Sequence, residues 1–127
     1  MNEYDAKWHD PPAPFAFIAI RHPKSALVVA RVPMLLDTGA DVTILPAAFI
    51  QPLNLDQVEA NFQLTGFDGT CSTGWVVEAH LIFLDRTFRG KYVVIDQEYG
   101  IIGRNLLNQL RVLLDGPSMT WSLVTAG

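Results

Sequence analysis

The sequence predicts an all-β, mainly antiparallel domain with one short helix near its C-terminal end. Three observations support this fold class. Short apolar runs rich in Val, Ile, Leu and Phe recur along the chain and are separated by turn residues. In residues 73–84 every second residue from Trp75 to Phe83 is apolar, which is the period of a strand. Helical spacing of apolar residues occurs convincingly in one segment only, after residue 103.

Composition narrows the classes of function. The chain has 127 residues, 50% of them hydrophobic, which is enough to bury a core without disulfides or a metal. The formal charge is −4 and Lys and Arg form no cluster, so we expect no nucleic-acid partner. The longest unbroken apolar run, residues 15–20, is too short to cross a membrane, so we expect no membrane partner.

Cysteine and histidine usage argues against a metal or cofactor. Cys71 is the only cysteine, which excludes an intramolecular disulfide and a thiolate cluster. His9, His22 and His80 lack the spacing of metal ligands. We therefore expect no metal and no cofactor.

The first fourteen residues differ from the rest of the chain. Residues 1–14 contain prolines at 11, 12 and 14 and lack the basic start and apolar centre of a secretory signal. We interpret them as a flexible Pro-rich arm, followed by a single domain over residues 15–127. Without a signal peptide or a membrane-spanning segment, the expected location is cytoplasmic.

The domain begins with a predicted hairpin. Residues 15–21 and 26–36 are strand-like, and residues 22–25 form the turn between them. Pro33 cannot donate a ladder hydrogen bond, which places it at an edge, at a bulge or on the outer side of a pairing.

The middle of the chain supplies two further strands. In residues 73–84 one parity is wholly apolar, whereas Glu78 and His80 fall on the other, so one face of this strand should be buried. Residues 86–90 are expected to turn the chain into a strand at 92–95.

The last elements are a helix and a hairpin. After a polar link at residues 96–100, Leu106, Leu107 and Leu110 give residues 103–110 one apolar side. A helix this short has to be held by packing. Residues 111–114 and 119–124 then form a second predicted hairpin, with its turn at 115–118.

Two motifs carry the chemistry. The first is LLDTGADVTIL, residues 35–45. In it Asp37 stands directly after an apolar strand and is followed by Thr38 and Gly39. A lone carboxylate is costly to bury, so this position needs a reason, although Asp-Thr-Gly alone is also typical of a turn. The second motif is GIIGRNLL, residues 100–107, an apolar pair followed by a glycine and a short helix.

In this order and spacing, the two motifs resemble those of the single-domain, retroviral-type aspartic proteases, the retropepsins. The resemblance runs from about Phe15 to about Leu114. It implies the retropepsin fold, a catalytic segment made of Asp37, Thr38 and Gly39, and a supporting strand and helix that contain Ile102 and Gly103.

The chemistry requires a second carboxylate. Peptide hydrolysis without a metal or a covalent intermediate needs a base for water and an acid for the leaving amine, and two carboxylates that share a proton can serve as both. Asp-Thr-Gly occurs once in the chain, so a monomer holds half of the pair. We therefore expect a homodimer with a two-fold axis between the Asp37 side chains. By resemblance, the Thr38 hydroxyl bonds to the opposite loop.

The neighbours of Asp37 carry further expectations. Ala40 has no hydroxyl to donate to the Asp37 carboxylate, which predicts a weakly acidic pH optimum. The resemblance implies that Asp41 meets the substrate backbone and pairs with Arg104, which would tie the helix to the loop. The alternative is that both side chains are simply solvated. Val42 is expected to line the substrate site, although core packing explains it equally well.

Residues 64–75 correspond to the flap, a hairpin that closes over substrate in this family. Its glycines suit a hairpin that moves. The predicted substrate contacts are Gly66, Phe67, Asp68 and Gly69. The tip is more polar than in the better-known viral members, and an ordinary surface hairpin is the alternative.

The sequence therefore predicts a homodimeric aspartic endopeptidase acting in polyprotein maturation or in limited cellular proteolysis. Its expected partners are a second copy of itself and a peptide or protein substrate. Two other hypotheses stay open. One is a dimerisation or peptide-binding module that keeps the fold but cleaves little, and the other is a small β-barrel that binds a ligand with no role for Asp37.

Overall fold

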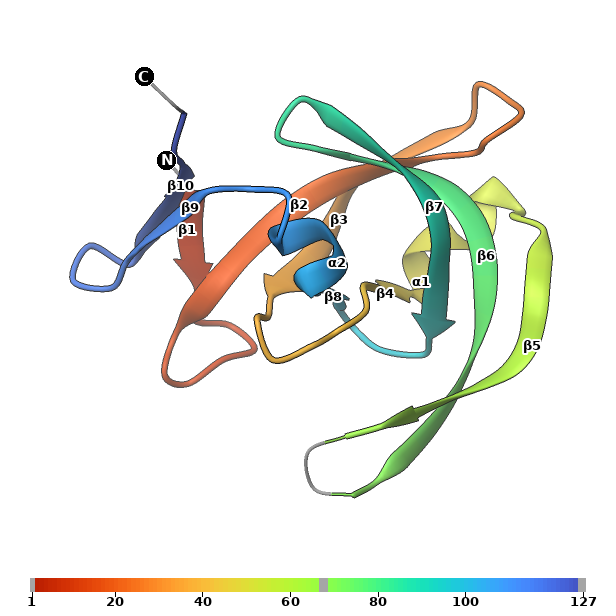
Figure 1. Ribbon diagram of the computed structural model, residues 1–127, viewed down its shortest axis with the longest axis horizontal. Helices are drawn as coiled ribbons and strands as arrows, with labels where there is room; N and C mark the ends of the chain where they lie inside the picture. Colours follow the sequence, from red (N-terminus) through yellow and green to blue (C-terminus); the bar gives the residue numbers. More distant parts are fainter. Residues whose placement is uncertain (1, 67–68, 126–127) are drawn as a thin grey trace.

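The computed structural model describes residues 2–66 and 69–125 and has one ten-stranded sheet in the order β5-β6-β7-β4-β8-β3-β2-β1-β10-β9 (Figure 1). The strands are β1 (Asn2–Asp5), β2 (Ala13–Arg21), β3 (Val28–Leu36), β4 (Ile44–Pro46), β5 (Gln57–Thr65), β6 (Cys71–Phe83), β7 (Arg86–Ile95), β8 (Gly100–Ile102), β9 (Val112–Asp115) and β10 (Thr120–Leu123). The helices are α1 (Ala47–Ile50), the 3₁₀ turn η1 (Gln51–Leu53) and α2 (Arg104–Leu107).

The predicted fold class is confirmed. Most strand pairs are antiparallel, and the parallel pairs are β3 with β8 and β4 with β7. The short strand β8 lies between β3 and β4, so that the end of β3 is supported from one side by residues 100–102. Both predicted hairpins form, β2–β3 and β9–β10. Pro33 lies opposite Phe17, one residue before the pairing with β8 begins.

The turn predicted at residues 86–90 is wrong. β7 is continuous from Arg86 and pairs with β6 over its length to Trp75. The chain reverses one step earlier, at Leu84 and Asp85, whose φ angles are 55° and 60°. Two consecutive left-handed residues make a turn that matches the twist of the strands, and Gly or Asn normally marks it. Leucine rarely adopts this conformation, so the usual signal is absent.

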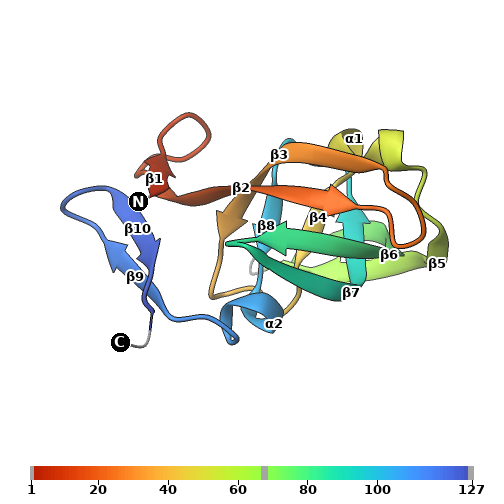
Figure 2. The same ribbon diagram turned by 90° about the horizontal axis from the view of Figure 1, so that it is seen from above.

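The flexible-arm prediction is wrong for the first residues that the structure describes. β1 pairs with β10 and with the start of β2, and β1 and the β9–β10 hairpin lie at one end of the molecule (Figure 2). Asp5 accepts hydrogen bonds from the backbone of Lys7 and Trp8 and contacts His9 Nδ1 at 2.8 Å. Burial raises the pKa of Asp5, but these hydrogen bonds outweigh it and hold the pKa below its usual value.

The described residues contain more and shorter helical segments than the sequence suggests. The helix expected over residues 103–110 forms as α2, and turns continue the chain to Leu110. α1 and η1 were not predicted, because residues 47–53 are too few to show a helical period. Among the described residues, no helix has the length and apolar character needed to cross a membrane.

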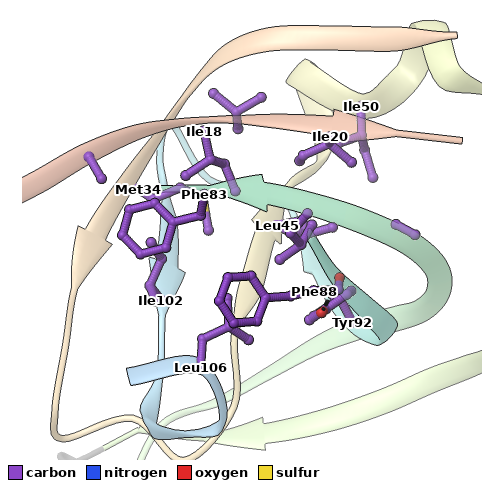
Figure 3. Close-up of a cluster of buried hydrophobic side chains, with 14 of the residues drawn as sticks. Ile18, Ile20, Met34, Leu45, Ile50, Phe83, Phe88, Tyr92, Ile102 and Leu106 are labelled. Carbon is purple, nitrogen blue, oxygen red and sulfur yellow. Dashed lines mark hydrogen bonds between the residues drawn. The ribbon is translucent and has the colours of Figure 1, made fainter. Parts of the chain in front are cut away.

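The core lies between the curved sheet and α2 (Figure 3). The apolar parity of β6 is buried as predicted at Val77, Ala79, Leu81 and Phe83. Tyr92 lies in the same cluster, where its hydroxyl donates to the carbonyl oxygen of Phe88 at 2.8 Å and burial raises its pKa to about 12. A second, smaller cluster underlies the flap and consists of Ile44, Val76, Val93 and Ile95.

Candidate active site

Asp37 follows the last residue of β3 and is held from behind by β8. Leu36 lies opposite Ile102, and the Asp37 amide donates to the Ile102 carbonyl oxygen at 3.0 Å. Ile102 is fully buried, so it forms a rigid support. Asp37 itself is half-buried, and its Oδ1 accepts a hydrogen bond from the Gly39 amide at 2.8 Å. The carboxylate is therefore fixed by its own loop.

Gly103 is required by close approach of the backbone. A Cβ at this position would lie 2.3 Å from the Val42 carbonyl oxygen and 3.0 Å from the Ala40 carbonyl oxygen. The next residue, Arg104, donates its amide to that Ala40 oxygen at 2.8 Å. The start of α2 is thus held against the loop that contains Asp37, residues 37–43 (the Asp37 loop), and Ala40 contributes through its backbone.

A buried threonine joins the same two segments. Thr43 is 1% exposed, and its hydroxyl donates to Asn105 Oδ1 at 2.7 Å and accepts from the Gly103 amide at 3.1 Å. Sequence reasoning missed both Thr43 and Asn105. The available signal was a hydroxyl inside an apolar stretch, because a buried hydroxyl has to find a partner.

The predicted ion pair between Asp41 and Arg104 is not formed within the described chain. Arg104 Nη1 instead donates to the Thr38 carbonyl oxygen at 2.8 Å, while Asp41 is exposed. The expectation that Arg104 ties the helix to the loop holds, but it does so through a backbone oxygen. The Arg104 side chain thus bonds to the neutral Thr38 carbonyl oxygen, whereas the Asp41 carboxylate is exposed to solvent.

The flap is the hairpin of β5 and β6. Its tip is closed by hydrogen bonds from the Gly66 amide to the Thr70 carbonyl oxygen at 2.8 Å and from the Gly69 amide to the Gly66 carbonyl oxygen at 3.1 Å. Gly69 has a φ of 82°, a conformation that favours glycine. The predicted contacts Phe67 and Asp68 lie outside the described residues.

A cavity of about 340 Å³ lies between the Asp37 loop and the flap. Its lining combines the loop, the flap and the second hydrophobic cluster: Asp37, Gly39, Ala40, Asp41, Val42, Ile44, Leu64, Thr65, Gly66, Thr70, Ser72, Ile95, Gln97 and Ile101. Val42 lines this cavity and also packs against the second hydrophobic cluster. Gly69 lies at the tip, and Thr38 lines a separate groove beside α2.

The histidines have local partners. His9 contacts Asp5, His22 Nδ1 accepts from the Lys24 amide at 3.0 Å, and His80 lies 3.3 Å from Arg21 Nη2. In the described part of the chain, no three His, Cys, Asp or Glu side chains gather in the way that a metal site requires.

An Asp-Thr-Gly loop under a β-hairpin, backed by an apolar strand and a short helix, defines a retropepsin-like site. The sequence profile described as Retroviral aspartyl protease matches residues 16–115, and the chain belongs to this family. The match agrees with the resemblance predicted from about Phe15 to about Leu114.

Solved structures support the same fold. The EIAV protease, in a structure titled as its complex with the inhibitor HBY-793, superposes with a TM-score of 0.60 and 21% sequence identity, over 76% of this chain and 86% of that one. At this identity the likeness shows the fold. The comparison with curated proteins gave no match.

Proposed function

We propose that the chain is a homodimeric aspartic endopeptidase in which Asp37 of each copy supplies one carboxylate. The family and fold imply a protease. The finer proposal is supported by one observation, the position of Asp37 between two hollows. Asp37 lines the cavity beneath the flap and also the groove of about 430 Å³ beside α2. A carboxylate placed there can face substrate on one side and a second copy on the other.

The count of carboxylates favours the dimer. The chain contains one Asp-Thr-Gly, and the family chemistry needs two carboxylates that share a proton. A two-fold axis beside Asp37 and Thr38 completes the pair with identical loops. One active site then serves two chains.

The loop geometry suits general acid–base catalysis. The ionised Asp37 carboxylate removes a proton from water, whose oxygen attacks the peptide carbonyl carbon, while the protonated partner's Asp37 donates a proton to the carbonyl oxygen. When the carbon–nitrogen bond breaks, the carboxyl that took the water proton donates it to the leaving nitrogen. The partner's Asp37 takes a proton from a hydroxyl group of the tetrahedral intermediate, whose oxygen becomes the carbonyl oxygen of the new carboxyl group. Because the Gly39 amide, Ile102 and Gly103 hold the loop, the carboxylates need little rearrangement between these steps.

The cavity suits an extended peptide. A strand laid between loop and flap can pair with backbone groups and alternate its side chains into pockets. The apolar floor of Val42, Ile44 and Ile95 fits an apolar side chain. Asp41, at the rim, and Gly66, on the flap, are placed to meet the backbone.

The test is cleavage of a mixed peptide library at pH 4 to 7, followed by mass spectrometry. Asp37→Asn is expected to lower cleavage by about a thousandfold or more, since the substitution removes the ionisable group from both halves of the site. Asp85→Asn is the matched control, because Asp85 lies in the β6–β7 turn and asparagine tolerates its positive φ.

Other outcomes select the rival functions. A dimer that binds peptides without Asp37-dependent cleavage would be a peptide-binding module. A monomer in which Asp37→Asn changes neither binding nor stability would instead favour a ligand-binding barrel.

A further inference from the structure

We propose that the outer face of the sheet binds a phosphorylated side chain of a partner protein through a row of three side chains, Arg21, His80 and Arg89. This inference goes beyond the proposed function and does not depend on it. None of the three residues lines the cavity beneath the flap or the groove beside α2. The row is therefore a surface separate from Asp37.

The register of three neighbouring strands creates the row. Arg21 of β2 lies opposite His80 of β6, and His80 lies opposite Arg89 of β7. Ala79 and Leu81, on either side of His80 in the chain, are buried in the core, so the row points away from the core. Arg89 is exposed, and Arg21 and His80 are partly exposed. Because neighbouring strands lie about 4.8 Å apart, the long arginine side chains at both ends can reach an anion held above His80.

The contact between Arg21 and His80 makes the whole row a set of donors. Arg21 Nη2 lies 3.3 Å from His80 Nδ1. A guanidinium can only donate, so Nδ1 is the acceptor and a neutral imidazole carries its proton on Nε2. The row then presents N–H groups from all three side chains. A phosphate monoester supplies three acceptor oxygens and about two negative charges, which matches two guanidinium groups.

The positive charge of the row is not neutralised within the described chain. Neither Arg21 nor Arg89 forms an ion pair with a carboxylate of the described residues. The next pair along the β6–β7 ladder on this face, Glu78 with Lys91, carries one charge of each sign. The whole chain has a formal charge of −4, so a general attraction for anions is not expected. Binding of an anion here would therefore depend on the local geometry of the row.

An apolar step beside the row favours a protein ligand over a free anion. Ala19 lies opposite Ile82, two residues from Arg21 and His80 on the same face of β2 and β6, and both are partly exposed. In an extended peptide, residues i and i+2 point the same way and lie about 6.8 Å apart. A phosphoserine above His80 would thus place a residue two positions away over this step. The proposed ligand is a phosphoserine with an apolar residue at that spacing.

The test is fluorescence anisotropy with labelled peptides at about 0.15 M salt, where long-range attraction is screened. The first peptide is Leu-Gly-phosphoserine-Gly-Leu, and two others carry serine or a pair of glutamates in place of the phosphoserine. Binding is measured with the Asp37→Asn variant, so that the peptides stay intact. The phosphopeptide is expected to bind at least about tenfold more tightly than either of the other two, because its charge and acceptors are concentrated on one group.

Two substitutions in the row and one beside it locate the site. Arg21→Gln and Arg89→Gln are each expected to raise the Kd of the phosphopeptide at least about tenfold, since each removes a charge-assisted contact. Lys91→Gln is the matched control, because it removes the same charge from the same face of β7, opposite Glu78. It should change the Kd by less than about twofold. Thermal melts check folding, and the exposed Arg89 still tests the row if Arg21→Gln impairs folding.

Several results would overturn the proposal. Equal binding of the serine and phosphoserine peptides, or an unchanged Kd in both arginine variants, would exclude the row as a phosphate site. Equal binding of the peptide with two glutamates would indicate a surface for acidic peptides instead. Inorganic phosphate that displaces the phosphopeptide at a concentration near the peptide's own Kd would indicate a site for the free anion and not for a partner protein.

The proposed function is tested separately from this site. Arg89→Gln, with Asp37 intact, should cleave the peptide library like the parent chain. Asp37-dependent cleavage without phosphopeptide binding would overturn the phosphate site and leave the proposed function. Phosphopeptide binding that depends on Arg21 and Arg89, in a chain without Asp37-dependent cleavage, would overturn the function and leave the site.

Discussion

The Asp37 loop and the flap face each other across one cavity but are held in opposite ways. The loop is bonded to β8 and α2 by the amides of Asp37 and Arg104 and by the buried hydroxyl of Thr43. β5 of the flap has β6 as its neighbour in the sheet, pairs with it through two register shifts, and is exposed over residues 57–61.

The difference separates two requirements of a peptidase. In the proposed mechanism the Asp37 carboxylate has to stay in one place because its charge is used during the reaction, which agrees with a loop that is tied to buried elements. The flap has to admit and release a peptide, so it is built from a hairpin with few buried contacts, which costs little free energy to displace. Four predictions test this contrast, from the largest expected effect to the smallest.

Paired glycine substitutions should give the largest difference between the two regions. Gly103→Ala is expected to lower the free energy of unfolding by about 3 kcal/mol, because the new Cβ meets backbone atoms of Ala40 and Val42. Gly69→Ala places its Cβ in open space and should cost about 1 kcal/mol, the penalty of a left-handed alanine. Urea denaturation measures both, and equal effects would contradict the contrast.

Removal of the Thr43 hydroxyl should have the next largest effect. Thr43→Val leaves the buried Gly103 amide without its acceptor and is expected to cost about 2 kcal/mol of unfolding free energy. Thr73→Val, on the exposed flap strand, should change it by less than about 0.5 kcal/mol. Chemical denaturation of both variants is the measurement. A harmless Thr43→Val would mean that the loop is held without this bridge.

Arg104 should matter less for stability than for activity. Arg104→Lys disturbs one exposed hydrogen bond to the Thr38 carbonyl oxygen and is expected to cost less than about 1 kcal/mol. Because Thr38 adjoins Asp37, we expect cleavage of a peptide found in the library screen to fall severalfold. Thermal melts and kcat/KM are compared with the parent chain. Unchanged dimer stability and activity would support a merely solvated arginine.

Ala40→Ser should give the smallest effect, confined to pH dependence. A serine hydroxyl that donates to the Asp37 carboxylate favours its charged form, so the acid limb of the rate profile should move to lower pH. Unfolding free energy should be unchanged within about 0.5 kcal/mol. The profile of kcat/KM from pH 3 to 7 is the measurement, and a parent rate that keeps rising down to pH 3 would refute the expected weakly acidic optimum.

Features that local chemistry determines could be predicted from the sequence. The strand period of β6, the turn residues of both hairpins and the glycine after Asp37 are properties of neighbours in the chain, and they led to the correct fold and to the loop. Features that depend on distant partners could not. The place of β1, the left-handed turn at Leu84 and the acceptor chosen by Arg104 depend on segments that meet only after folding.

The pairing of β1 with β10 has a consequence during synthesis of the chain. Trp121 is 1% exposed, contacts the ring of Phe83 and donates its indole N–H to the Phe15 carbonyl oxygen at 2.8 Å. β1 therefore cannot complete this pairing until β10, the last strand described, has left the ribosome. Such distant pairing slows folding. A nascent chain whose Trp121 has not yet emerged from the ribosome lacks part of its core. We therefore expect the proposed proteolytic activity to arise only after β10 has been translated.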